Sequence, residues 1–140
     1  MKLLVDANIL LDVMQARKTH VEDSSLIWKL CETGEAEGYV SALTFANLVY
    51  AMRKELDPKD IHSVLDKLRL IFHIAALSEA DLKQASKMEW KDFEDAIQCA
   101  TAERIGADFI ITRNVKNFLR SRKAFAFTPA ELLKRYFQFQ

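Results

Sequence analysis

The stretch "KLLVDANILLDVM", residues 2–14, decides the fold. Its apolar run Leu3–Val5 is typical of a short buried strand. After this run, apolar residues recur at helical spacing from Ile9 to Met14, so the chain changes from strand to helix at Asp6. A carboxylate at such a junction is either a helix cap or a chemically active group, and the rest of the sequence must distinguish the two.

The remainder of the chain repeats this alternation of strand and helix. We expect strands at residues 2–5, 38–41, 71–75, 108–112 and 124–127. We expect helices from after residue 5 to about 15, and at 21–33, 44–55, 58–70, 79–88, 91–104, 115–120 and 128–137. Strands separated by helices favour parallel pairing with right-handed crossovers. The pattern therefore predicts one α/β domain over residues 1–140, an open parallel sheet with helices on both faces.

Composition narrows the function classes. Lysine and arginine total 20, as do aspartate and glutamate, so the net charge gives no indication of a polyanionic partner and any basic patch must be local. Acidic residues interrupt the apolar N-terminus and no apolar stretch is long enough to span a membrane, so we expect no signal peptide, no membrane association and a cytoplasmic location. The two cysteines, Cys31 and Cys99, are far apart and are expected to fill core space.

Polar side chains cluster where strands end and helices begin. In an open parallel sheet, ligands bind beyond the carboxyl ends of the strands, so these side chains are the candidates for a functional site. They are Asp6, Ser41, Asn47, Asp92, Asp95, Thr112, Arg113, Asn114 and Asn117. The spacing of Asp92 and Asp95 puts both carboxylates on one face near the start of a helix.

Each acid also has a purely structural interpretation. Asp6, Asp92 and Asn114 could each cap the helix that follows. Asp95 is harder to explain in this way, because it is next to apolar helix positions and an unpaired buried carboxylate is costly. If the first and fourth strands are neighbours, the carboxylates converge and repel by about 4 kcal/mol at an effective dielectric of about 20. Such a cluster needs a counter-ion, and oxygen ligands select Mg²⁺ or Mn²⁺.

Two other classes of phosphate chemistry are disfavoured. The chain has three glycines in all, and neither a G-x-G-x-x-G turn nor a phosphate-binding P-loop is present. A dinucleotide or ATP enzyme is therefore not expected. A phosphatase of the haloacid dehalogenase-like family would carry a second acid two positions after Asp6, where this chain has Asn8.

Four segments together resemble a PIN domain. They are "LLVDANILLDVM", "VSALTFANLVYAMRK", "DFEDAIQCATAERIGADFIITRNVKNF" and the closing "FTPAEL", and they cover essentially the whole chain in order. The resemblance implies a three-layer fold with a five-stranded parallel sheet, and a ribonuclease that depends on Mg²⁺ or Mn²⁺. Many bacterial relatives are VapC-type toxins that a small antitoxin holds inactive, and many form homodimers.

The resemblance also implies roles for individual residues. Asp6 matches the first acid of the family and Asp95 the third, with Asp92 an additional acid one turn before. Thr112 and Asn114 match the Thr-x-Asp/Asn element.

Two further positions differ from the common pattern. Asn117 stands where an acid often precedes phenylalanine, and Asn47 replaces a metal-binding glutamate, as in a branch of the family that resembles "SALTFAN". The resemblance thus favours a metal ligand over a helix cap for Asp6.

The resulting hypothesis is a divalent-metal-dependent endoribonuclease that hydrolyses RNA with a metal-activated water. Catalysis would rest on Asp6, Asp92, Asp95 and Asn114, with the three acids at the metal. Secondary roles would fall to Ser41, Asn47, Thr112 and Asn117, and RNA contacts to Arg113 and Lys116. The alternative is a PIN-like module that binds RNA or a partner protein with weak or no turnover, which the three amides at acid positions favour.

Overall fold

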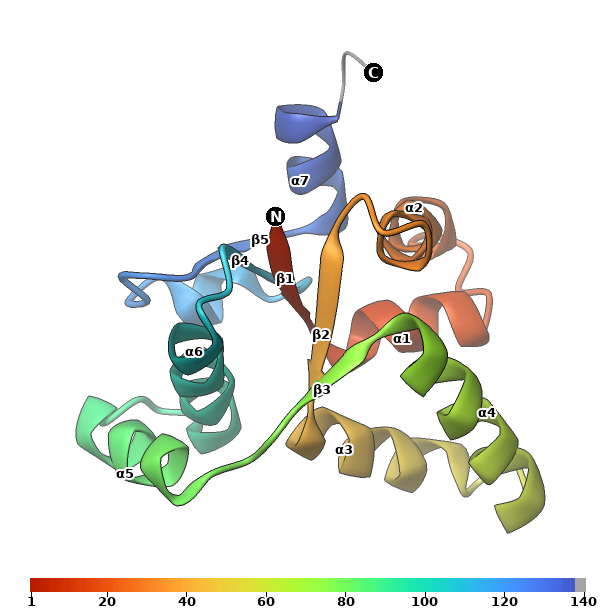
Figure 1. Ribbon diagram of the computed structural model, residues 1–140, viewed down its shortest axis with the longest axis horizontal. Coiled ribbons are helices and arrows are strands. Elements are labelled where there is room, and N and C mark those ends of the chain that lie inside the picture. Colours follow the sequence, from red (N-terminus) through yellow and green to blue (C-terminus); the bar gives the residue numbers. More distant parts are fainter. Residues whose placement is uncertain (138–140) are drawn as a thin grey trace.

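A five-stranded parallel sheet forms the centre of the protein, in the order β3-β2-β1-β4-β5 (Figure 1). The computed structural model describes residues 1–137. The strands are β1 Lys2–Val5, β2 Glu37–Ser41, β3 His73–Ala75, β4 Phe109–Ile111 and β5 Phe125–Phe127. β1 lies between β2 and β4, so the first strand is central and its ends are flanked on both sides. The predicted α/β architecture is confirmed.

Helices connect the strands and cover both faces of the sheet. Their bounds are α1 Ala7–Met14, α2 Val21–Glu32, α3 Ala42–Met52, α4 Pro58–Ile71, α5 Glu79–Met88, α6 Phe93–Ile105 and α7 Pro129–Tyr136, with a 3₁₀ helix η1 at Val115–Phe118. No helix within residues 1–137 combines the length and the apolar character that crossing a bilayer requires.

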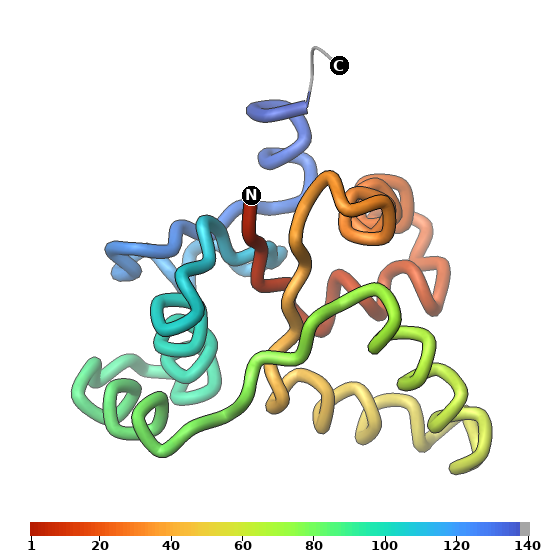
Figure 2. The backbone as a smooth tube through the Cα atoms, in the orientation of Figure 1, coloured from red at the N-terminus to blue at the C-terminus, as the bar shows by residue number. Residues whose placement is uncertain are grey.

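Alternation along β1 divides the core into two layers. Leu3 and Val5 belong to the larger cluster, which the residues of α1, α2, α3, α4 and α7 complete. Leu4 points to the other face, where it joins Cys99 of α6 and Phe118 of η1. Figure 2 shows the same division as two groups of helices on either side of the central strands. A strand buried on both faces explains why residues 3–5 are uniformly apolar.

Helix caps account for two of the differences between expected and observed boundaries. Helix α3 begins at Ala42, two residues before the expected start, because the Ser41 hydroxyl accepts a hydrogen bond from the Thr44 amide at 3.0 Å. Helix α6 begins at Phe93, two residues later than expected, because Asp92 is its N-cap. Strand β3 is shorter than expected because α4 continues to Ile71.

Gly38 permits a close approach between β2 and the helix layer. A Cβ atom at this position would lie 2.6 Å from Cys31 Sγ and 2.8 Å from Phe72 Cδ1, both closer than real Cβ atoms come. Cys31 and Phe72 are themselves buried in the larger core cluster. The cysteine is therefore a packing residue, as predicted, and so is Cys99, which is also buried.

We predict that Gly38→Ala lowers the free energy of unfolding by about 1–3 kcal/mol, because the added methyl overpacks the site. Cys31→Ala removes the sulfur atom that lies nearest to the added methyl, so the double variant should lose less stability than the two single losses added together. Urea denaturation of the four proteins measures this coupling. Strictly additive losses would contradict the proposed contact.

Candidate functional site

The pairing of β1 with β4 brings Asp6 next to Thr112. The Asp6 amide donates to the Ile111 carbonyl at 3.0 Å, which aligns the two strand ends. The Thr112 hydroxyl then donates to Asp6 Oδ2 at 3.0 Å, and the Ala7 amide donates to Oδ1 at 2.8 Å. Both carboxylate oxygens are thus oriented by fixed donors. Burial raises the pKa of Asp6 above its usual value, although these hydrogen bonds and the charge of Arg113 act in the opposite direction.

Asp95 lies in the first turn of α6. Its Oδ2 atom is buried and has no hydrogen-bond partner within residues 1–137. Burial, followed by the negative charges of Asp92 and Asp6, raises the pKa of Asp95 to about 6. Asp6 thus lies near enough to disfavour ionisation of Asp95. An unpartnered buried carboxylate oxygen within electrostatic reach of a second acid is a natural ligand position for a cation.

Asp92 has an evident structural role. It is exposed, and its Oδ1 atom accepts a hydrogen bond from the Asp95 amide at 3.1 Å, so it caps α6. The cap fixes the backbone of the turn that carries Asp95. The structural interpretation of Asp92 is therefore correct, and its role at a metal stays a prediction.

The amides are distributed around the two acids. Asn114 is exposed, and its backbone N–H donates to the Thr112 hydroxyl at 3.1 Å. The Asn117 side chain lowers the pKa of Asp95 and lines a groove together with it. Asn47 is exposed on α3. The groove also includes Lys116.

Ser41 contributes to the fold rather than offering a free hydroxyl. It is buried, caps α3 and donates to Thr44 Oγ1 at 3.0 Å. Gln98 of α6 donates to the same Thr44 oxygen at 3.2 Å. This buried bridge joins α3 to α6 behind Asp95. The sequence analysis missed Gln98 and Thr44, although a glutamine three residues after Asp95 in an apolar helix was a usable signal.

Asp12 is the most important residue that the sequence analysis missed. Its side chain is fully buried in α1, and its oxygens accept from Ser24 at 2.9 Å and lie 3.4 Å from Arg17. It also pairs with Arg113 at 3.5 Å, and the Arg113 side chain is only 27% exposed. Arg113 is thereby held beside Asp6. A carboxylate between apolar residues of a helix was a signal, because such a charge needs partners.

The donor set fits a hard divalent cation. Among residues 1–137 no three histidine, cysteine, aspartate or glutamate side chains form a group that could hold a metal ion. Two carboxylates do converge, and Mg²⁺ is commonly held by one or two carboxylates, with water and substrate phosphate as further ligands. The unpartnered Asp95 oxygen and the raised pKa values of both acids match this arrangement.

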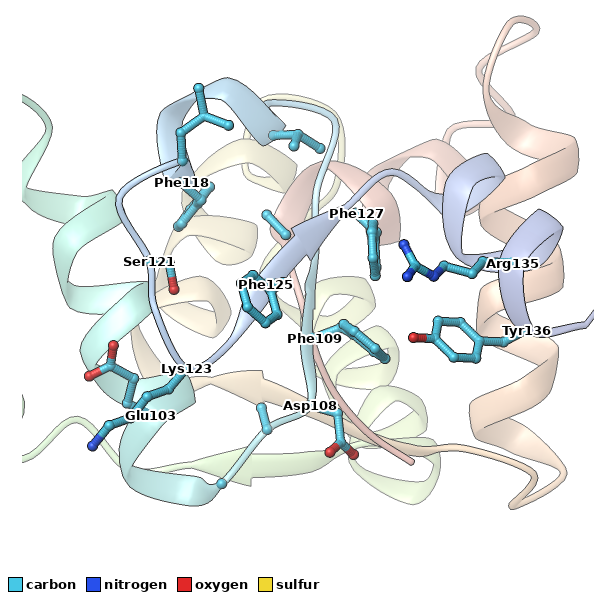
Figure 3. A pocket seen from close by; sticks show the side chains of 15 residues that line it. Glu103, Asp108, Phe109, Phe118, Ser121, Lys123, Phe125, Phe127, Arg135 and Tyr136 are labelled. Carbon is cyan, nitrogen blue, oxygen red and sulfur yellow. The ribbon is translucent and has the colours of Figure 1, made fainter.

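A large pocket of about 900 Å³ lies away from these acids, beside β4, β5 and α7 (Figure 3). Its wall includes Phe109, Phe127 and Tyr136, whose rings lie 4.9–6.5 Å apart. The Arg135 guanidinium lies 5.7 Å from the centre of the Phe127 ring. Asp108, which precedes β4, lines the pocket, so it opens near the amino end of that strand, opposite the end with Thr112.

Comparison with known protein families and structures gives one consistent result. Residues 2–116 match the PIN domain family. Similar solved structures include VapBC-1 from nontypeable Haemophilus influenzae, with 17% identity and a TM-score of 0.71 over 93% of this chain and 99% of that one. DNA-bound VapBC from Salmonella typhimurium matches with 14% identity and a TM-score of 0.71 over 92% and 98%.

A third similar structure is VapC20 from Mycobacterium tuberculosis, described as a toxin that cleaves the sarcin-ricin loop. It is 12% identical, with a TM-score of 0.62 over 77% of this chain and 86% of that one. At these identities the structural likeness establishes the fold alone. No curated protein matches the sequence.

We predict that Asp95→Asn stabilises the metal-free protein at pH 7.5 and has less effect at pH 5. A folded-state pKa of about 6, above the usual value of an aspartate, favours the protonated folded protein, so stability falls as pH rises toward about 6. Asparagine mimics the neutral form. Denaturation in chelator at both pH values measures the effect, with the change Glu55→Gln at an exposed position as control. An equal shift at both pH values would contradict the prediction.

We predict that Asp12→Asn lowers the free energy of unfolding by about 1.5–3 kcal/mol, because three charge-assisted contacts are weakened in a buried position. The same change at the exposed Asp23 should alter stability by no more than about 0.5 kcal/mol. Thermal and urea unfolding of both variants provide the comparison. Similar losses of stability in the Asp12 and Asp23 variants would show that the contacts of Asp12 with Ser24, Arg17 and Arg113 do not stabilise the protein.

Proposed function

The chain belongs to the PIN-domain family, and from this premise we propose that it is an endoribonuclease that depends on Mg²⁺ or Mn²⁺. The observation that carries the proposal is the pair of acids Asp6 and Asp95, each with a raised pKa and with the charge of Asp6 acting on Asp95. Repulsion between two neighbouring carboxylates destabilises the folded protein, and a bound cation would remove that repulsion.

In this proposal Asp6 and Asp95 hold the ion directly. Asp92, Asn114, Asn47 and Asn117 would add oxygen ligands directly or through water. A divalent ion at this position would supply a water nucleophile at neutral pH and stabilise the charge that develops on the phosphodiester.

The surrounding residues position these ligands. The Thr112 hydroxyl holds one oxygen of Asp6 and so fixes the direction of its free lone pairs. The Asp92 cap and the bridge from Ser41 through Thr44 to Gln98 hold α6 in place. These contacts exist in the chain before any ion binds, so the cost of ordering the ligands is met by folding.

RNA contacts would come from Lys116 and Arg113. Lys116 lines the groove that contains Asp95. Arg113 is held by Asp12, so it would offer a fixed positive charge to a phosphate near Asp6 rather than a flexible one. Both residues would neutralise backbone charge at the point of cleavage.

We further propose that the protein is the toxin of a toxin–antitoxin pair and a homodimer. This rests on the kind of protein that it resembles. The similar structures include a toxin–antitoxin complex from Klebsiella pneumoniae and FitAcB from Neisseria gonorrhoeae. An antitoxin would then cover the acids and restrain the enzyme.

A second candidate function is a PIN-like binding module with weak turnover. Its specific support is the ligand inventory: residues 1–137 offer no group of three potential metal-binding side chains, and Asn47 is exposed and uncharged. In this version the domain binds RNA or a partner protein through the same face and cleaves poorly.

We predict that the protein cleaves single-stranded RNA with Mn²⁺ or Mg²⁺ present, that chelator stops cleavage, and that Asp6→Asn reduces the rate at least a hundredfold. The loss follows because the ion would lose a charged ligand. Asp66→Asn makes the same chemical change on the exposed face of α4 and should leave the rate unchanged. Gel analysis of a labelled RNA measures all three proteins.

Melting curves separate the two candidate functions. Mn²⁺ should raise the melting temperature of the native protein, because the ion binds the folded state, and Asp95→Asn should abolish that rise. A rise without cleavage would favour the binding module. If Mn²⁺ does not raise the melting temperature and the protein does not cleave RNA, although it melts cooperatively, the proposed metal site is wrong.

A further inference from the structure

Two adjoining hollows that share Trp90, Leu119 and Arg120 form a groove leading away from Asp95. Its first part, of about 570 Å³, contains Asp95 and Asp92 together with Trp90 and Arg120. Its second part, of about 650 Å³, also includes Trp90 and Arg120 and extends to Glu103 at the other end. The groove therefore passes along α5 and α6 on one side and the segment after η1 on the other. We call its two parts together the basic track.

The basic track concentrates positive charge in a chain with no net charge. Six cationic side chains line it, and none of them belongs to an ion pair within residues 1–137. They are Lys87, Lys91, Lys116, Arg120, Arg122 and Lys123. Outside Asp92 and Asp95, its one acid is Glu103, which lies with Lys123 where the track borders the aromatic pocket (Figure 3). Unpaired cations in a groove attract a polyanion.

Trp90 stands at the middle of the track, where the two parts meet. One side of its indole packs edge-on against Phe118, with ring centres 5.9 Å apart and planes at 75°. The side chain is only partly buried and lines both parts of the groove. Arg120 donates to the Met88 carbonyl at 3.2 Å, which ties the segment after η1 to the end of α5 close to Trp90. The indole is thus held in place with surface still open.

We propose that the basic track binds a single-stranded RNA segment that continues from the cleavage site, with one unpaired base against Trp90. This inference rests on the proposed function and adds the path of the substrate. Cations that follow a groove match a phosphodiester backbone, and an aromatic face among them matches an unstacked base. A duplex keeps its bases stacked inside, so it could use the cations but not the indole.

The charge of the track is tested by the salt dependence of binding. The full chain is titrated with a short labelled single-stranded RNA in chelator, where binding occurs without cleavage. Arg122→Gln with Lys123→Gln should weaken binding and reduce the slope of log affinity against log salt by about 1.4, because two fewer counterions are released. The matched control is Lys59→Gln with Lys67→Gln on exposed positions of α4, which should leave the slope unchanged.

The position of the base is tested by fluorescence. The chain has two tryptophans, and Trp28 is packed edge-on against Phe72 at 5.4 Å, so Trp28→Phe leaves Trp90 as the one reporter. Single-stranded RNA should quench this emission, and a duplex of the same length should quench it much less. Trp90→Leu should weaken single-strand binding about fivefold or more, and circular dichroism verifies that it folds.

The possible results separate this inference from the proposed function. RNA binding with an unchanged slope in the Arg122/Lys123 variant, or without quenching of Trp90, would overturn the track even if the protein cleaves RNA. A polyglutamate peptide that binds the track as tightly as RNA would assign it to an acidic protein partner instead. A reduced salt slope in the Arg122/Lys123 variant and quenching of Trp90, in a protein that does not cleave RNA, would support RNA binding by the basic track and contradict the proposed ribonuclease activity.

Discussion

The pairing of β1 with β4 is the constraint on which the site depends. It joins residues that are 106 positions apart in the chain, so that the Thr112 hydroxyl reaches the Asp6 carboxylate. Because the strands are parallel, both polar side chains emerge at the same edge of the sheet. Leu4 and Ile110 are registered opposite one another and are fully buried, which holds this alignment from within the core. A shift in register would separate the acid from its donor.

Two carboxylates in this protein, the buried Asp12 and the half-buried Asp95, have opposite environments. Asp12 has a hydroxyl and two guanidinium groups around it, so its charge is satisfied by the fold. Asp95 has a buried oxygen with no partner in residues 1–137 and a pKa raised by burial and by other acids. A carboxylate whose hydrogen bonds and ion pairs are formed within the fold has a structural role. A buried carboxylate oxygen without such a partner marks a position where a ligand could bind. This contrast is the physical basis for proposing Asp95, rather than Asp12, as a metal ligand.

Local signals in the sequence predicted the elements well, and interactions across the fold were harder to foresee. Strand β1 and the starts of α4 and α5 depend on neighbouring residues, so they could be predicted. The expected starts of α3 and α6 were wrong by two residues, because the hydrogen bonds that Ser41 and Asp92 accept, rather than the apolar spacing, determine where these helices begin. The Asp12 network joins α1, α2 and the segment after β4, and no spacing rule connects these positions.

The distribution of charge explains how a neutral chain could hold a polyanion next to acids. Asp6 and Asp95 repel phosphate in the absence of a cation, so the acids alone cannot attract RNA. The unpaired cations of the basic track begin in the same groove, with Lys116 and Arg120 lining it beside Asp95. The residues that would attract the RNA are thus adjacent to, but separate from, the residues that would bind the ion. Changes in the track should act on binding, and changes at the two acids on turnover, since only the acids would touch the ion.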